Sequence, residues 1–183
     1  MIPSFYFTWR YLTFRTPPTV DVSSLPAPAS PHVERLFVQT PQGRLELLHA
    51  VPTPASSSPG TAAGSGRAAP ILFCHGGMGS AWVWESWMSA LASRHGIESY
   101  AVSLRGHGNS WQPSYLRMVF GFGKDDFVGD LEVAARFVKE QKGEDVVLVG
   151  HSAGGGISQY LLYRGRAKVK GLALLGAWPG YGG

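Results

Sequence analysis

The stretch Val146-Val147-Leu148-Val149-Gly150-His151-Ser152-Ala153-Gly154-Gly155-Gly156 decides the fold. Its first four residues are aliphatic or β-branched, which is typical of a short strand that is buried on both faces. The pattern G-x-S-x-G follows from Gly150 to Gly154, and apolar residues such as Ile157 and Leu161 then recur at helical spacing. The stretch therefore predicts a strand, a tight turn with Ser152 at its centre, and a helix.

A strand-turn-helix junction of this kind can present a serine hydroxyl as a nucleophile. The glycines have a mechanical task, because the serine backbone is strained and side chains at Gly150 and Gly154 would clash. We predict that Ser152 is the nucleophile and that the backbone N–H of Ala153, at the positive end of the helix, binds an oxyanion. The structural alternative is a Gly-rich turn with a capping serine. A phosphate-binding loop fits worse, because neither Gly-Lys-Ser/Thr nor G-x-G-x-x-G is present there.

Length and composition restrict the class of protein. The 183 residues predict one domain with a sizeable core, and 44% of them are hydrophobic. The net charge of +4 is mild and no basic run interleaves with aromatics, so we expect no nucleic-acid partner. The single cysteine, Cys74, excludes an internal disulfide and favours a reducing compartment such as the cytoplasm. No apolar run approaches the roughly 18 residues of a membrane helix. We expect no metal and no cofactor.

Residues 1–31 are predicted to form a flexible arm, and residues 32–183 the folded domain. The arm carries Arg10 and has no acidic residue before Asp21, so a mitochondrial presequence is the alternative to an unstructured segment. The compartment therefore stays open between the cytoplasm, which is favoured, and the mitochondrion. Residues 52–69 are Pro, Ser, Gly, Ala and Thr with one Arg, which predicts a disordered insert.

The rest of the pattern predicts an N-terminal β-hairpin followed by alternating strands and helices. Strands are expected at 33–40, 44–51, 70–74, 97–104 and 169–176, in addition to the strand that precedes Ser152. Helices are expected at 81–95 and 125–141, and residues 111–123 are expected to be irregular. On the first helix, the residues at core-facing spacing are Trp84, Trp87, Met88 and Leu91.

This order predicts an α/β fold with a mostly parallel sheet of about six strands flanked by helices. Ligands bind at the carboxyl ends of the strands in such sheets. The glycine-rich turns that begin at His75, Arg105 and Gly150 all follow strands, so they converge on that rim.

These three turns resemble those of the α/β-hydrolase superfamily, in its general AB hydrolase form. His75-Gly76-Gly77 is similar to the family's oxyanion loop, and Arg105-Gly106-His107-Gly108-Asn109-Ser110 to its R-G-x-G-x-S turn. Gly150-His151-Ser152-Ala153-Gly154 is similar to its nucleophile elbow, and the resemblance covers roughly residues 33–178. One departure is Ser103, where family members often carry Asp; we interpret it as a local structural change.

The resemblance implies a role for each matching residue. Ser152 would be the nucleophile, and the backbone N–H groups of Ala153 and Gly77 would bind the oxyanion, with Met78 as the alternative to Gly77. The substrate site would be bordered by three further residues: His75, Gly76 and His151.

The resemblance also implies a triad acid and a histidine later in the chain, yet no Asp, Glu or His follows Ser152. Three upstream histidines are weaker candidates for the base. His75 is expected to order the oxyanion loop, His107 to be a satisfied turn residue and His151 to point elsewhere. A solvated helix face is expected to hold the nearby acids: Asp125, Asp126, Asp130 and Glu132.

The sequence therefore predicts an incomplete α/β-hydrolase fold, the N-terminal portion only. Its sixth strand becomes an exposed hydrophobic edge, which favours self-association. The implied activity is that of a serine hydrolase acting on a small hydrophobic ester or related acyl compound, with two triad members missing. One alternative is a non-catalytic ligand-binding or interaction module. Another is a cofactor-free haloperoxidase-like or C–C hydrolase, whereas an Asp-type epoxide hydrolase is disfavoured because Ser152 occupies the nucleophile position.

Overall fold

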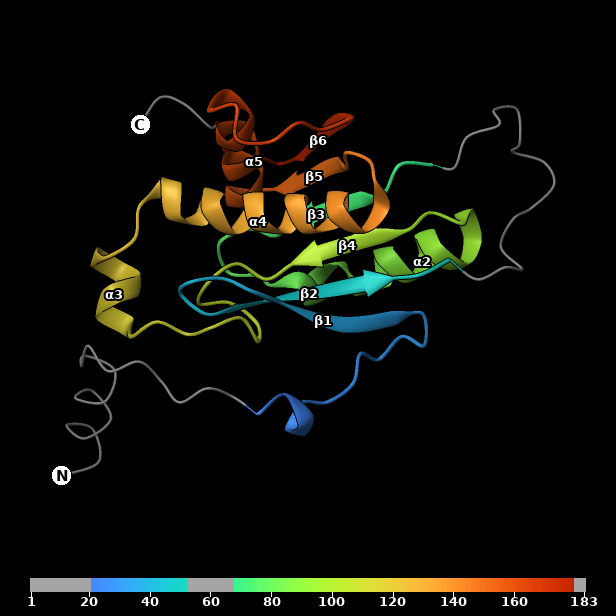
Figure 1. Ribbon diagram of the computed structural model, residues 1–183, viewed down its shortest axis with the longest axis horizontal. Coiled ribbons are helices and arrows are strands. Elements are labelled where there is room, and N and C mark those ends of the chain that lie inside the picture. The colour runs from blue at the N-terminus through green and yellow to red at the C-terminus, as the bar shows by residue number, and fades with distance from the viewer. Residues whose placement is uncertain (1–20, 53–67, 180–183) are drawn as a thin grey trace.

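One six-stranded sheet organises the chain, and helices cover both of its faces (Figure 1). The computed structural model describes residues 21–52 and 68–179. The strands are β1 (Val33–Gln39), β2 (Arg44–Ala50), β3 (Ile71–Cys74), β4 (Ser99–Val102), β5 (Val147–His151) and β6 (Gly171–Leu175). The helical elements are η1 (Val22–Ser24), η3 (Ala81–Trp84), α2 (Glu85–His95), α3 (Tyr115–Phe120), α4 (Lys124–Lys142) and α5 (Ala153–Tyr163).

The strand order is β1-β2-β4-β3-β5-β6. The hairpin β1–β2 is antiparallel, as is the β2–β4 pair, while β4, β3, β5 and β6 run parallel. This arrangement confirms the predicted fold class, including the N-terminal hairpin. Because β3, β4 and β5 are parallel neighbours, the turns that follow them meet at one end of the sheet.

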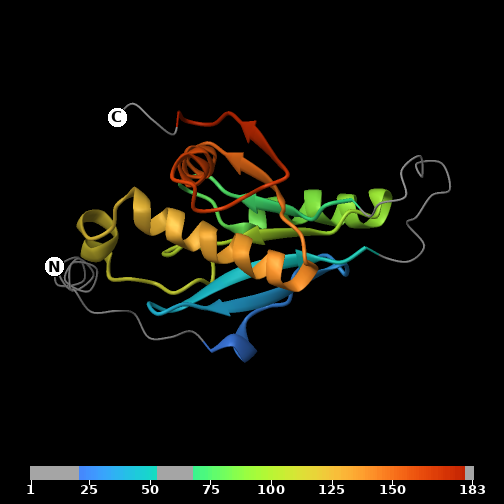
Figure 2. The ribbon, with the colours of Figure 1, turned by 45° about the horizontal axis from the view of Figure 1, so that its top comes forward.

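Each face of the sheet has its own core, because successive side chains of a strand point in opposite directions. Leu72 and Leu148 pack on the side of α4 and α5, in a cluster that includes Leu131 and Leu161. Phe73 and Val149 face the other side, in the cluster that contains residues of η3 and α2. Figure 2 shows α4 and α5 on one side of the sheet and α2 on the other.

Two local expectations were wrong. Trp87 is 55% exposed instead of buried, and its ring meets the buried Trp84 edge-on with centroids 5.8 Å apart. Residues 111–123 are not wholly irregular, because they contain α3. Its residue Met118 reaches back over the turn after β4, where a Cβ on Gly106 would lie 2.6 Å from the methionine Cε.

β6 forms one edge of the sheet, as the sequence predicted. Its side chains are poorly covered: Leu172 is 37% exposed and Leu174 is 42% exposed. Among the described residues, no strand pairs with the outer edge of β6.

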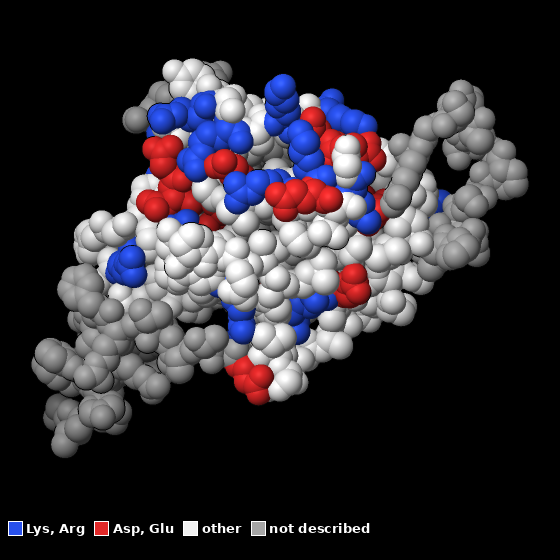
Figure 3. All heavy atoms as spheres, viewed as in Figure 1, with Lys and Arg blue, Asp and Glu red and all other residues white. Residues whose placement is uncertain are grey.

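Charged side chains of both signs intermingle over α4 and α5 (Figure 3). Arg166 lies 2.6 Å from Glu132 and 3.7 Å from Asp125, and Lys139 lies 2.8 Å from Asp145. The charges on this face therefore largely neutralise one another.

Part of the predicted arm and insert lies outside the described residues, namely 1–20 and 53–67. The described end of the arm contacts α2, since the Ser30 backbone N–H donates to Glu85 Oε1 at 2.7 Å and the Ser30 hydroxyl donates to Ser89 Oγ at 2.8 Å.

Candidate active site

Ser152 has a strained backbone between β5 and α5. Its φ is 52° and its ψ is −123°, and it is the one non-glycine residue with a positive φ in the described part of the chain. Such a conformation costs roughly 1–3 kcal/mol and persists only where the surroundings impose it. Ser152 N–H donates to Leu175 O at 3.1 Å, and Ser152 O accepts from Gly155 and from Trp178.

The Ser152 hydroxyl does not cap α5, although the serine occupies the N-cap position. It makes no hydrogen bond to any residue that the structure describes. The structural alternative of a capping serine therefore fails, and the hydroxyl is left available for chemistry.

The elbow glycines are required by close packing. A Cβ on Gly154 would lie 2.2 Å from the His75 carbonyl oxygen, and one on Gly150 would lie 2.7 Å from the Gly155 Cα. Gly155 is equally tight, because its Cβ would lie 2.3 Å from the Ala177 Cβ. The start of α5 is thus pressed against the end of β3, and only glycine permits that approach. Gly155 was not singled out from the sequence, because its contact lies beyond β6.

The loop after β3 lies against the elbow, as the resemblance implied. A Cβ on Gly76 would lie 3.1 Å from the Ser152 Cβ, and one on Gly77 would lie 3.9 Å from the Ala153 Cβ. Ala153 begins α5, so its N–H has no acceptor within the helix. The N–H groups of Gly77 and Met78 donate to no described residue. Unpaired N–H donors of the loop and of the start of α5 therefore lie beside the candidate nucleophile.

His75 is buried, with both ring nitrogens occupied. Its Nδ1 is 2.7 Å from Gly76 O and its Nε2 accepts from the Leu104 N–H at 3.1 Å, which fixes the neutral Nδ1–H tautomer. The pKa of His75 is lowered to about 4, chiefly by burial and to a smaller extent by the nearby His107, against the opposing effect of the Gly76 hydrogen bond. His75 therefore orders the loop, and it has no free nitrogen to accept a proton from Ser152.

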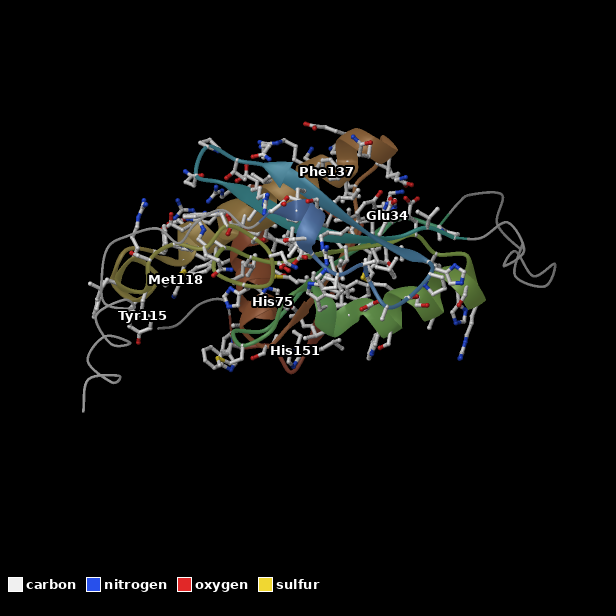
Figure 4. All side chains as sticks on the ribbon, turned by 90° about the horizontal axis from the view of Figure 1, so that it is seen from below. Glu34, His75, Tyr115, Met118, Phe137 and His151 are labelled. Atoms are coloured by element: carbon white, nitrogen blue, oxygen red, sulfur yellow. The ribbon has the colours of Figure 1, made fainter. Side chains whose placement is uncertain are left out.

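The two other histidines are not hydrogen-bonded to Ser152 either. His107 lies with Nδ1 2.8 Å from Arg105 O and Nε2 2.9 Å from Gly77 O. His151 is exposed, and its ring meets Trp84 edge-on at 6.4 Å. Figure 4 shows His75 and His151 near each other, and a Cβ on Gly76 would lie 3.1 Å from the His151 Nδ1. The described residues thus bring together the candidate nucleophile and the candidate N–H donors, with no base hydrogen-bonded to Ser152.

Asp130 requires a correction. It was expected on a solvated helix face, but it is 2% exposed and binds the buried Arg105. Its Oδ1 accepts from Arg105 Nη2 at 2.8 Å, and its Oδ2 accepts from both Nε and the backbone N–H of Arg105 at 2.9 Å. This forked pair joins α4 to the turn after β4, which helps to hold the rim of the site.

Glu46 explains the departure at Ser103. Glu46 lies on β2, is fully buried and accepts from the Ser103 hydroxyl at 2.8 Å. It also accepts from the Asn109 backbone N–H at 2.9 Å and from the Asn109 side chain at 2.6 Å. The carboxylate that steadies this turn therefore comes from a neighbouring strand. Sequence reasoning missed Glu46 because the residues that it binds are distant along the chain.

The sequence signature described as "alpha/beta hydrolase fold" matches residues 69–181. The chain belongs to the alpha/beta hydrolase fold family. The matched segment contains the loop at His75, the turn at Arg105 and the elbow at Ser152, so the signature and the rim described above coincide.

Three known proteins are similar to parts of the chain. A non-heme haloperoxidase of Rhodococcus erythropolis is 38% identical over 117 residues, which are 63% of this chain and 39% of that protein. A Vigna radiata epoxide hydrolase mutant superimposes with a TM-score of 0.59 at 21% identity, over 78% of this chain and 38% of the other. The thioesterase domain from the curacin biosynthetic pathway superimposes with a TM-score of 0.60 at 23% identity, over 79% of this chain and 46% of the other. The chain thus spans less than half the length of each, and the two structural likenesses concern the fold alone.

Residues 21–52 and 68–179 contain neither a cluster of metal ligands nor a membrane-spanning helix. No group of three or more His, Cys, Asp and Glu side chains is arranged to hold a metal ion. None of the helices there has the length and apolar character needed to cross a membrane.

Proposed function

We propose that this chain carries the nucleophile of a serine hydrolase that cleaves an ester or a related acyl bond in a small, apolar substrate. The Ser152 hydroxyl oxygen attacks the acyl carbon, and the carbonyl oxygen takes on negative charge. The N–H groups of Ala153 and Gly77 bind that oxyanion, each worth about 10²–10³ in rate. The observation that carries the proposal is the strained Ser152 backbone, which leaves its hydroxyl unbound beside these donors.

Attack by serine also needs a proton acceptor. His75 and His107 have their ring nitrogens engaged elsewhere, and His151 makes no hydrogen bond to the serine. We therefore propose that the acceptor comes from a polypeptide segment outside the described residues. An oxyanion hole and binding site alone can retain about 10³–10⁴ of rate enhancement over water, so a slow reaction is expected from this chain by itself.

Fluorophosphonate labelling tests the proposal. The native chain, Ser152→Ala and Ser86→Ala are incubated with the reagent, and the modified peptide is located by mass spectrometry. Ser86 is the matched control, because it is an exposed serine on α2. We expect an adduct on Ser152 in the native chain and in Ser86→Ala, and none in Ser152→Ala. An adduct that survives in Ser152→Ala, or the absence of any adduct at high reagent concentration, contradicts the proposal.

A second candidate function is favoured by the relative from Rhodococcus erythropolis, a non-heme haloperoxidase. The Ser152 hydroxyl would then pass the acyl group of a carboxylic acid to hydrogen peroxide with loss of water, and the released peracid would oxidise bromide to hypobromous acid while returning to the carboxylate. Incubation with acetate, hydrogen peroxide, bromide and a dimedone reporter distinguishes the two: Ser152-dependent bromination favours the haloperoxidase reaction, and ester hydrolysis alone favours the first proposal.

A non-catalytic binding module is the remaining candidate, and the observation that favours it is the lack of a base near Ser152 within the described residues. This candidate predicts that an apolar ester raises the melting temperature of the native chain and of Ser152→Ala equally, without turnover in either.

A further inference from the structure

Two histidines hold two successive carbonyl groups of the loop after β3. His75 Nδ1 is 2.7 Å from Gly76 O, and His107 Nε2 is 2.9 Å from Gly77 O. In a trans peptide the C=O and the following N–H point in opposite directions. His75 therefore sets the direction of the Gly77 N–H, and His107 sets that of the Met78 N–H. Gly77 N–H is the loop donor that we assign to the oxyanion, and Met78 N–H is the alternative to it.

One further hydrogen bond closes the loop, from the Gly79 N–H to Gly76 O at 3.0 Å, and among the described residues it leaves the peptide between Gly77 and Met78 without a partner other than His107. Gly76 and Gly77 have no side chains, and the Met78 side chain is fully exposed. The nearest contact that a Cβ on Gly77 would make is 3.9 Å away, which is ordinary packing distance. Since glycine accepts many backbone conformations, the peptide between Gly77 and Met78 would be free to rotate without a hydrogen bond. Rotation would release the Gly77 carbonyl oxygen, which repels an oxyanion.

The position of His107 is fixed by the turn after β4. Its Nδ1 lies 2.8 Å from the carbonyl oxygen of Arg105, two residues earlier, and the Arg105 side chain is hydrogen-bonded to the buried Asp130. His107 lies between Gly106 and Gly108, which both have positive φ, and a Cβ on Gly108 would lie 2.5 Å from Glu46 Oε2. Both partners of the ring are carbonyl oxygens that only accept, so the ring binds the loop when Nε2 carries a proton.

We propose that His107 is a positioning residue for the oxyanion loop: its Nε2–H holds the Gly77 carbonyl oxygen away from the Ser152 centre and so keeps the Met78 N–H, the alternative loop donor, directed at it. His107 itself touches no reacting atom. The kinetic consequence rests on the proposed function, whereas the restraint on the loop does not.

Three variants separate the hydrogen bond from the shape of the ring. His107→Gln keeps an N–H donor near the position of Nε2, His107→Asn places its donor near Nδ1, and His107→Phe keeps the ring without a donor. In ¹⁵N-labelled full chain, the native His107 should show a protonated Nε2. The backbone order parameters of Gly77 and Met78 should be near the rigid value of about 0.85 in the native chain and in the Gln variant. They should fall below about 0.6 in the Asn and Phe variants.

The rate of fluorophosphonate labelling at Ser152 provides the second measurement. We expect the labelling rate to fall about tenfold or more in the Asn and Phe variants. The fall should not exceed the one expected when a whole oxyanion donor is removed. The Gln variant should label near the native rate, and circular dichroism should show that all variants are folded.

The two measurements have separate consequences. An unprotonated Nε2, or unchanged order parameters in the Asn and Phe variants, overturns the inference. Equal labelling of all four proteins also overturns it and leaves the proposed function standing. No labelling of the native chain, together with a loop that loosens in the Asn and Phe variants, refutes the proposed function and supports the restraint by His107.

Discussion

Replacement of Gly154 by alanine should loosen the elbow. The new Cβ would lie 2.2 Å from the His75 carbonyl oxygen and 2.6 Å from that of Cys74, both of them backbone atoms of β3 and its end. Neither oxygen can rotate away, so the cost should reach the upper end of overpacking, ~3 kcal/mol, offset by the ~1 kcal/mol that alanine gains over glycine in a helix. A net loss of about 2 kcal/mol lowers the melting temperature by about 4–8 °C in a chain of this size.

Gly156→Ala is the matched control on the same helix. The nearest atom to its Cβ would be the Trp178 carbonyl oxygen at 3.4 Å, an ordinary contact. Alanine should therefore keep its helical advantage of up to ~1 kcal/mol and raise the melting temperature by a few degrees. Thermal unfolding followed by circular dichroism measures both, and fluorophosphonate labelling should slow only in Gly154→Ala. If Gly154→Ala melts at or above the temperature of Gly156→Ala, the close packing that we assign to the elbow is wrong.

Four more changes test other parts of the structure. Asp130→Asn removes the buried countercharge of Arg105 and leaves the more exposed Asp126, whose Oδ1 lies 3.2 Å from Arg105 Nη1, so urea unfolding should show a loss of about 3 kcal/mol, the lower end for a broken buried pair; a loss under 1 kcal/mol would contradict the buried pair. The pKa of His75 falls on folding from 6.5 to about 4, so the free energy of unfolding should drop by up to about 3 kcal/mol as the pH is lowered from 6.5 to 4. An unfolding free energy that stays constant over this pH range would refute the lowered pKa of His75. Burial raises the pKa of Cys74 to about 12, so iodoacetamide should modify it in urea and not in the native chain. Leu174→Lys should reduce any association through β6, measured by size-exclusion chromatography against dilution; an unchanged elution profile in an associating chain would exclude that edge.

The features that could be predicted from the sequence are local ones. The hairpin at Pro41-Gln42-Gly43 and the strand-turn-helix around Ser152 follow from periodicity and glycine placement within short windows. The clash expected at Gly150 and Gly154 could also be predicted, because a strained serine turn leaves no room beside it wherever it occurs. The fold class followed from the order of these segments.

The features that could not be predicted are partners brought together by the sheet. Glu46 and Ser103 are far apart along the chain, yet β2 and β4 are neighbours, so the buried carboxylate reaches the turn after β4. Asp130 looked solvated because it sits among acids near the start of α4. It does, however, share the helix face of Ala134, four residues on, and that spacing is the one signal that would have found it.

The elbow and the exposed edge of the sheet are one mechanical unit. Ser152 N–H donates to the Leu175 carbonyl at the end of β6, and Ser152 O accepts from Trp178, just beyond that strand. Two of the hydrogen bonds that hold the strained serine therefore come from an edge strand and the residues after it, the part of the sheet with the least support. The other constraints, Gly154 against β3 and the loop at His75, come from the core. The candidate nucleophile Ser152 is thus fixed on one side by the interior and on the other by β6, and we expect any polypeptide that pairs with β6 to steady Ser152 as well as to cover the apolar edge.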